Sequence, residues 1–267
     1  MAAKTPFHDY QHALDFDARA ARSDVRAQLG AWLVEALELK GGERVLDIAT
    51  GTGRVARPVA KHLDGGKVVG LDEAAAMLRV AREQEAKDPI PGYVQTVGVA
   101  ESLPFRDKVF DRAFVVLSLH HFGDPPLVAQ ETFRTLKPGG TFVVLDPVLL
   151  EARDRLDKSL HDLINMIFRR THGENFRFHT AEEIRHLLAG AGLRIPRADL
   201  HTISFDQESM EGIPTGRHWL EVAEQIQTES AEMRARFEQS YLEYRKVDGK
   251  VRIKGRLSFA LICGERR

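Results

Sequence analysis

The sequence has one cysteine among its 267 residues and no signal-like apolar stretch near its first residue. A single cysteine cannot build a disulfide framework, and Cys263 lies in an apolar run, as expected of a buried thiol in a reducing compartment. No run of residues is long and apolar enough to span a membrane. These absences argue against a secreted disulfide scaffold or a membrane-spanning protein, and we expect a cytoplasmic location.

Charge of one sign is also missing, because 38 basic residues balance 39 acidic ones and leave a formal net charge of −1. This balance argues against nucleic acid or another polyanion as the main partner. Histidines, cysteines and carboxylates show no close ligand spacing, so we predict a reaction without a metal. Hydrophobic residues make up 43% of the chain and charged residues 29%, which fits a globular protein with a sizeable core.

One stretch, residues 43–56, combines a strand, a glycine turn and a helix. Its apolar run at 45–48 fits a buried strand, residues 50–53 break that run with two glycines, and a helical pattern resumes at Val55. Glycines let the backbone approach a ligand closely, and the free N–H groups at a helix start attract polar or anionic groups. The pattern therefore predicts a ligand-binding turn.

Asp47 narrows the choice of ligand because it lies in the strand just before the glycines. A carboxylate here repels the pyrophosphate of a dinucleotide and attracts a cationic amino group. The run Asp47-Ile-Ala49-Thr-Gly51-Thr-Gly53 resembles the first motif, Asp/Glu-x-Gly-x-Gly-x-Gly, of class I S-adenosylmethionine (SAM) dependent methyltransferases. Ala49 replaces the first glycine, as it also does in the ubiquinone/menaquinone-type (UbiE-like) branch. The resemblance implies that SAM is the cofactor, with contacts from Asp47, Ala49, Thr50, Gly51 and Gly53.

A second acidic position ends the next buried strand, Lys67 to Asp72. Asp72 follows Asp47 by 25 residues, about one strand–helix–strand step, and nucleotide sites of the Rossmann type place an acid there to accept the ribose hydroxyls. Glu73 is its neighbour, but it opens the following helix, so we prefer Asp72 as the ribose ligand and keep Glu73 as an adjacent contact. A plain helix-capping role for Asp72 is the alternative.

Residues 98–105, Gly-Val-Ala-Glu-Ser-Leu-Pro-Phe, follow a third strand at 93–97 and resemble the segment that wraps the adenine in this family. The family usually has Asp or Asn where this chain has Val99, and valine cannot accept a hydrogen bond from the adenine amine. We expect adenine to be held by stacking and by backbone groups near Ala100, or by compensation from Glu101.

The fourth strand, 109–117, runs into Ser118-Leu-His120-His121-Phe-Gly-Asp124. Ligands of open parallel sheets bind at the carboxyl ends of the strands, so both histidines are placed to approach the methyl donor. They are weak candidates for a catalytic base, since the resembling family often carries Leu-His-His here without using it so. The resemblance also implies cofactor contacts from Met77, Leu117 and Ser118.

The alternation of strands and helices over residues 43–147 predicts an α/β fold. The resemblance implies a Rossmann-like, seven-stranded, mostly parallel sheet with helices on both faces and an antiparallel last strand. We divide the chain into an N-terminal helical segment (1–42), a SAM-binding core (43–205), a helical insert (206–250) and the last core strand (251–267). The insert is expected to hold a long charged helix, roughly 228–245, and mainly to mediate association as a dimer arm, with a substrate lid as the alternative. We expect a helix at 151–170 and the N-terminal segment to line the acceptor pocket.

The most favoured function is transfer of a methyl group from SAM to an O, N or C nucleophile of a small organic molecule. Two alternatives stay open. One is a catalytically silent methyltransferase fold that serves as a SAM-binding regulator or subunit, because Val99 departs from the family pattern. The other is a nicotinamide-dependent dehydrogenase that uses the glycines of 51–56, which Asp47 opposes.

Overall fold

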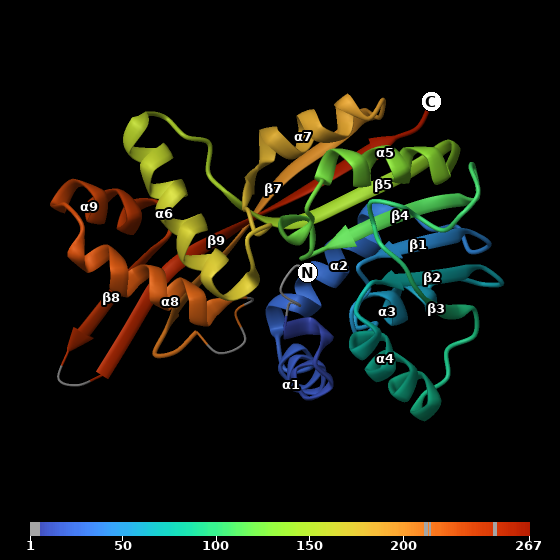
Figure 1. Ribbon diagram of the computed structural model, residues 1–267, viewed down its shortest axis with the longest axis horizontal. Helices are drawn as coiled ribbons and strands as arrows, with labels where there is room; N and C mark the ends of the chain where they lie inside the picture. Colours follow the sequence, from blue (N-terminus) through green and yellow to red (C-terminus); the bar gives the residue numbers. More distant parts are fainter. Residues whose placement is uncertain (1–5, 211–212, 214, 248–249) are drawn as a thin grey trace.

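The computed structural model describes residues 6–210, 213, 215–247 and 250–267, and within these it forms one nine-stranded mixed sheet (Figure 1). Seven strands follow the order β3-β2-β1-β4-β5-β9-β7, while β6 pairs with β5 and β8 with β9. β1 to β5 are parallel, and β9 is antiparallel to β5, β7 and β8. The strands are β1 Arg44–Ile48, β2 Lys67–Asp72, β3 Tyr93–Val97, β4 Phe110–Val116, β5 Leu136–Leu149, β6 His179–Thr180, β7 Arg194–Gln207, β8 Leu242–Val247 and β9 Lys250–Glu265.

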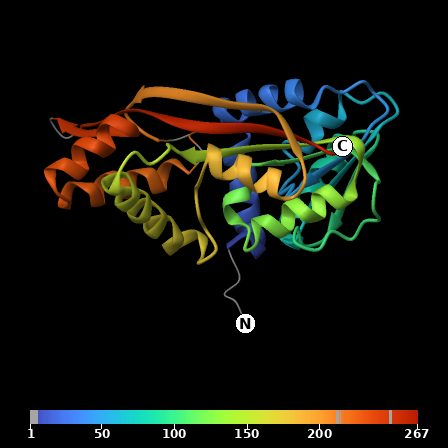
Figure 2. The same cartoon turned by 90° about the horizontal axis from the view of Figure 1, so that it is seen from above.

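Helices cover both faces of this sheet, which confirms the predicted fold class (Figure 2). Adjacent residues of β1 point to opposite faces, so Val45 packs with α2 and α3 while Leu46 packs with α5 and α7. The helices are α1 Tyr10–Ala20, α2 Asp24–Leu37, α3 Ala56–Ala60, α4 Ala75–Lys87, α5 Pro125–Thr135, α6 Arg155–His172, α7 Ala181–Gly190, α8 Gly216–Gln225 and α9 Ala231–Ser240, with short 3₁₀ turns η1 Pro6–His8, η2 Leu119–His121 and η3 Ile226–Thr228.

The prediction of one long helix at 228–245 is wrong. α9 ends at Ser240, and β8 follows it and pairs with β9. Leu242 is fully buried, and Tyr244, two residues on, packs against the same core cluster, a spacing that suits a strand. The backbone partner offered by β9 therefore outweighs the helical propensity of this charged segment.

Helix α1 lies in the N-terminal segment that was expected to be helical, although its bounds were not predicted. The Asp9 side chain caps its first turn by accepting a hydrogen bond from the His12 amide at 2.7 Å. Ala13 is buried with Met77 and Val80 of α4. Packing between α1 and α4 therefore stabilises a helix whose own sequence gives only a weak helical pattern.

The insert is part of the main core rather than a separate appendage. Its elements α8, α9 and β8 gather with α6 at the end of β7 and β9 that lies away from β1–β4 (Figure 1). Trp219, Val222 and Phe237 of the insert are buried in the same cluster as Phe168 of α6. Residues 211, 212, 214, 248 and 249 of the insert lie outside the described residues. Among the helices that the structure does describe, none has the length and apolar character needed to cross a bilayer.

Candidate functional site

The turn after β1 places three residues in the left-handed backbone region. Ala49 has φ 59°, Gly51 has φ 55° and Gly53 has φ 78°. The conformation costs a residue with a side chain on the order of 1 kcal/mol, which explains why glycine is usual at the position of Ala49. Leu117, at the end of the neighbouring β4, has φ 54° and is a second strained residue at this edge. Strain of this kind gathers at binding sites.

Asp72 holds the turn from the end of β2. Its carboxylate accepts hydrogen bonds from the Gly51 amide and the Ala74 amide, both at 2.8 Å. Asp72 is not the N-cap residue of α4, because Ala74 holds that position, but its carboxylate binds the Ala74 amide just ahead of the helix. Burial raises the pKa of Asp72, and the two backbone donors oppose that shift. Glu73 points elsewhere, with 59% of its side chain exposed, and lies 4.0 Å from His8.

Asp47 is a buried carboxyl group without a cation. Only 2% of the residue is exposed, and the Thr50 hydroxyl donates a hydrogen bond to it at 2.7 Å. No lysine or arginine among the described residues lies within ion-pair distance. Burial raises the pKa of Asp47 to about 8. Thr52 Oγ1, in the same turn, is buried and finds no hydrogen-bond partner in the part of the chain that the structure describes.

These features fit a ligand with a cationic amino group and several polar atoms. Such a ligand would stabilise the ionised form of Asp47, which burial disfavours, and would give Thr52 Oγ1 a hydrogen-bond partner. A perturbed acid beside a strained glycine turn marks a functional site by physical criteria. SAM carries such a group, and the turn therefore suits it.

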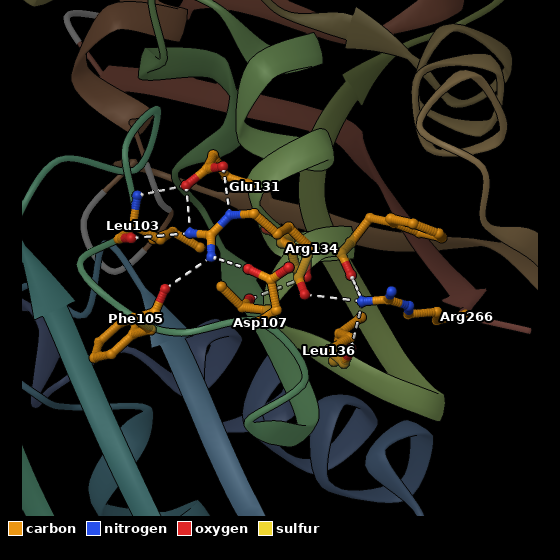
Figure 3. A network of polar contacts seen from close by, with 10 residues as sticks. Leu103, Phe105, Asp107, Glu131, Arg134, Leu136 and Arg266 are labelled. Atoms are coloured by element: carbon orange, nitrogen blue, oxygen red, sulfur yellow. Dashed lines mark hydrogen bonds and ion pairs between the residues drawn. The ribbon is translucent and has the colours of Figure 1, made fainter.

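The segment expected to wrap the adenine is fixed to α5 by a polar network (Figure 3). The Arg134 guanidinium donates to the Phe105 carbonyl at 2.8 Å and to the Leu103 carbonyl at 3.1 Å. It also pairs with Glu131 and Asp107, and Glu131 accepts from the Leu103 amide at 3.0 Å. The pKa of Arg134 is raised, mainly by its hydrogen bond with Glu131. No sequence pattern predicted this network, which ties the segment to α5.

The side chains of this segment differ in exposure. Val99 is 46% exposed, whereas Ala100 is buried. Glu101 accepts from the Gly123 and Asp124 amides at 3.2 and 3.4 Å, so it ties the segment to the loop after β4.

The remaining predicted contacts lie around the same edge of the sheet. Met77 is buried beneath α1, Leu117 ends β4, and the Ser118 hydroxyl donates to the Val116 carbonyl at 3.1 Å. These positions surround the turn, and their role toward a cofactor stays a prediction.

A carboxylate at position 99 should tighten SAM binding. Asp in place of Val99 would accept a hydrogen bond from the adenine amine at a position that is open enough to take a charged side chain without burying it. We expect about a fivefold lower Kd for Val99→Asp, since a net hydrogen bond contributes about 1 kcal/mol. Calorimetry on Val99→Asp and on Val94→Asp, an exposed β3 control, tests this; weaker binding by a folded Val99→Asp would refute our placement of adenine.

His120 of η2, the turn that follows β4, and Asp146 of β5 form a buried pair. The His120 Nδ1 and Asp146 Oδ2 atoms are 2.8 Å apart, and the His120 amide donates to the same oxygen at 3.2 Å. Both side chains are at most 2% exposed. Asp146 was not proposed from the sequence, although a carboxylate near the carboxyl end of a strand beside β4 is a recognisable signal.

His121 lies at the meeting point of three segments. Its ring contacts Phe7 of the N-terminal segment at 5.4 Å and His172 of α6 at 5.3 Å between centroids. His172 Nε2 is in turn 3.3 Å from His218 Nδ1 of the insert. Burial lowers the pKa of His172 to about 3 and that of His121 well below its usual range, so both rings are neutral near pH 7. We call this group, Phe7, His121, His172 and His218, the aromatic wall.

Metal ligation is not apparent in this region. Within the described residues, no group of three or more His, Cys, Asp or Glu side chains is arranged to hold a metal ion. A reaction without a metal stays a prediction.

Comparison with known proteins places the turn, the adenine segment and β4 within one domain. A family described as a methyltransferase domain matches residues 46–144. The ubiquinone/menaquinone biosynthesis C-methyltransferase UbiE of Geobacter sulfurreducens is 28% identical over 204 residues, which span 70% of this chain and 79% of that protein. The demethylmenaquinone methyltransferase of Thermotoga maritima is 39% identical, over 39% of this chain and 43% of that protein. The chain thus spans most of the first relative but less than half of the second.

Solved structures share the fold at low sequence identity. The YcgJ protein of Bacillus subtilis superimposes with a TM-score of 0.73 at 21% identity, covering 90% of this chain and 99% of that one. A putative methyltransferase of Bacillus halodurans has a TM-score of 0.71 at 24% identity, covering 89% and 98%. These likenesses establish the Rossmann-like fold.

Proposed function

Because the chain is a UbiE-like class I SAM-dependent methyltransferase acting on a small molecule, we propose that its acceptor is a reduced, quinone-type ring. The observation that carries the cofactor assignment is the turn at 49–53 between two buried acids, Asp47 and Asp72. The acceptor class follows from two relatives whose names refer to ubiquinone, menaquinone and demethylmenaquinone.

Each part of the turn has a role toward the cofactor in this proposal. Asp47 would pair with the amino group, the Gly51 and Gly53 backbone would lie along the amino acid portion, and Asp72 would accept the ribose hydroxyls. Ala100 and its neighbours would hold the adenine in the segment that Arg134 fixes. SAM supplies a methyl group on a sulfonium, a good leaving group, so positioning of the acceptor contributes much of the acceleration.

The aromatic wall supports a planar, largely apolar acceptor. Phe7, His121, His172 and His218 present rings rather than charges, because burial keeps the histidines neutral. Aromatic rings contribute contact area and stacking geometry suited to a ring-shaped ligand. The N-terminal segment, α6 and the insert all contribute to the aromatic wall. In this proposal the insert therefore helps to enclose the acceptor, in addition to any role in association.

A labelled transfer assay tests the proposal directly. Purified protein, SAM with a tritiated methyl group, and a naphthoquinone with a short isoprenoid chain, kept reduced by dithionite, should give a labelled organic product. The oxidised quinone is the matched control and should give none, since it lacks the electron-rich ring. If label instead appears only in compounds from another fraction of a metabolite extract, the acceptor belongs to a different chemical class.

The catalytically silent SAM-binding protein is the remaining alternative. It would bind SAM in calorimetry yet transfer no methyl group to any fraction of a metabolite extract. Association into a homodimer and a cytoplasmic location also stay predictions, which mass measurement in solution and cell fractionation would test.

A further inference from the structure

We propose that His120 and Asp146 form a proton-accepting dyad, with His120 as the base for the methyl acceptor and Asp146 as its positioning residue. The proposal rests on the proposed function and narrows it to acceptors whose nucleophile carries an acidic proton, such as a hydroquinone or phenol hydroxyl. Acceptors with no proton to lose, such as tertiary amines, are outside this class.

Asp146 fixes which nitrogen of His120 can accept a proton. Its Oδ2 atom lies 2.8 Å from His120 Nδ1 and accepts a hydrogen bond from it. The neutral ring therefore carries its proton on Nδ1 and leaves Nε2 without one. The same oxygen accepts from the His120 amide at 3.2 Å, which sets the orientation of the residue as well as its tautomer. This is the base-and-orienter arrangement that proton transfer requires.

The surroundings of the dyad favour an acid–base role over a purely structural one. Asp146 Oδ1 is buried and has no hydrogen-bond partner among the described residues, so the pair is only half satisfied. A half-satisfied buried polar pair stabilises a fold less than apolar packing of the same volume would. The carboxylate instead suits a ring that becomes positively charged for part of the reaction.

The other titratable groups around the ring come from three elements. His121 of η2 lies 4.3 Å away between ring centroids, His179 of β6 interacts electrostatically with both members of the dyad, and His172 of α6 lies beyond His121. Burial lowers the pKa of all three, so near pH 7 they add no positive charge against an imidazolium at His120. Phe176 and Phe178 pack on the His120 ring, with their ring centroids 5.1 and 5.5 Å from it.

The proposed step balances without an oxidant or a further reactant. The acceptor hydroxyl gives its proton to His120 Nε2, and the electron pair freed on the acceptor forms the new bond to the methyl carbon. The bond between that carbon and sulfur breaks, and its electron pair stays on sulfur, which becomes neutral. His120 then releases the proton to water.

His120→Gln is the first test because glutamine keeps a polar amide of similar size at this position but cannot act as a base. We expect SAM affinity within about twofold of wild type, an unchanged melting temperature, and methyl transfer slower by about 10²–10⁴-fold. His186→Gln, an exposed histidine on α7, is the matched control and should retain full transfer. Transfer within tenfold of wild type in His120→Gln overturns the proposal.

Acceptor acidity separates a base from a merely structural histidine. Across reduced naphthoquinones with increasingly acidic hydroxyls, the defect of His120→Gln should shrink, because an acceptor that is already ionised needs no base. A defect of equal size for every acceptor indicates lost positioning and overturns the role. Asp146→Asn should keep SAM affinity and shift the acidic limb of the kcat/KM pH profile.

Nitrogen-15 NMR of the wild-type histidines keeps the proposal testable if a variant fails to fold or if no acceptor is found. We expect the resonances of His120 to show a protonated Nδ1 and a bare Nε2 in the neutral ring. The opposite tautomer overturns the dyad whatever the acceptor is. Absence of transfer to reduced naphthoquinones, with the expected tautomer present, contradicts the proposed acceptor class and not the dyad.

Discussion

Asp72→Ala should weaken SAM binding by about 10–150-fold. The carboxylate is expected to accept charged hydrogen bonds from the ribose hydroxyls, and the loss of such a partner costs about 1.5–3 kcal/mol. The same side chain holds the Gly51 and Ala74 amides at 2.8 Å, so the turn that carries the amino acid portion would loosen as well. Calorimetry with SAM measures the combined effect.

Glu73→Ala is the control for this prediction because it removes the same charge one residue away. Its side chain is largely exposed and lies near His8, so we expect an affinity within about twofold of wild type. Thermal unfolding of both variants shows how much of the Asp72 effect is structural. If Asp72→Ala binds SAM as tightly as wild type and Glu73→Ala binds it more weakly, our assignment of the ribose to Asp72 is wrong.

The sequence was informative wherever one local pattern determined both backbone and chemistry. The apolar runs ending at Ile48 and Asp72 predicted two parallel strands, and the structure pairs them in register, with Asp47 beside Gly70. The glycine turn was recognisable because residues 49, 51 and 53 need backbone angles that few residues other than glycine adopt. Local rules of this kind can be read without knowing the rest of the fold.

The parts that escaped prediction depend on contacts between distant segments. The Arg134 network joins α5 to carbonyl groups 29 and 31 residues earlier, and no spacing rule announces it. Likewise, His218 reaches His172 only because the insert folds back onto α6. β8 formed where a helix was expected because β9 supplies its hydrogen-bond partner. Tertiary packing decided each of these cases.

Asp146 could be recognised from the sequence only in part. It stands near the carboxyl end of β5, so the rule that ligands bind at the carboxyl ends of parallel strands could have drawn attention to it. What the sequence does not provide is the 2.8 Å distance between Asp146 Oδ2 and His120 Nδ1, or the burial of both side chains. Distance and burial, rather than residue type, made His120 a stronger candidate than the sequence alone allowed.

Asp47→Asn should make the free protein more stable at neutral pH and yet impair SAM binding. Burial raises the pKa of Asp47 from 3.8 to about 8, so between these values the folded state binds a proton that the unfolded state releases. Stability of the wild type therefore falls as pH rises through this window, by up to about 1.4 kcal/mol per pH unit. An amide has no such titration, and it can still accept the hydrogen bond from Thr50.

Binding should change in the opposite direction, because an amide cannot neutralise the cationic amino group of SAM. Loss of one partner of a buried charge pair costs about 3–5 kcal/mol, which corresponds to a Kd raised at least about 100-fold. Denaturant unfolding between pH 5 and pH 8, with Asp162→Asn on exposed α6 surface as the control, should show a flatter profile only for Asp47→Asn. A variant that is less stable than wild type at pH 7.5, or that keeps its SAM affinity, would show that this buried acid serves the fold rather than the cofactor.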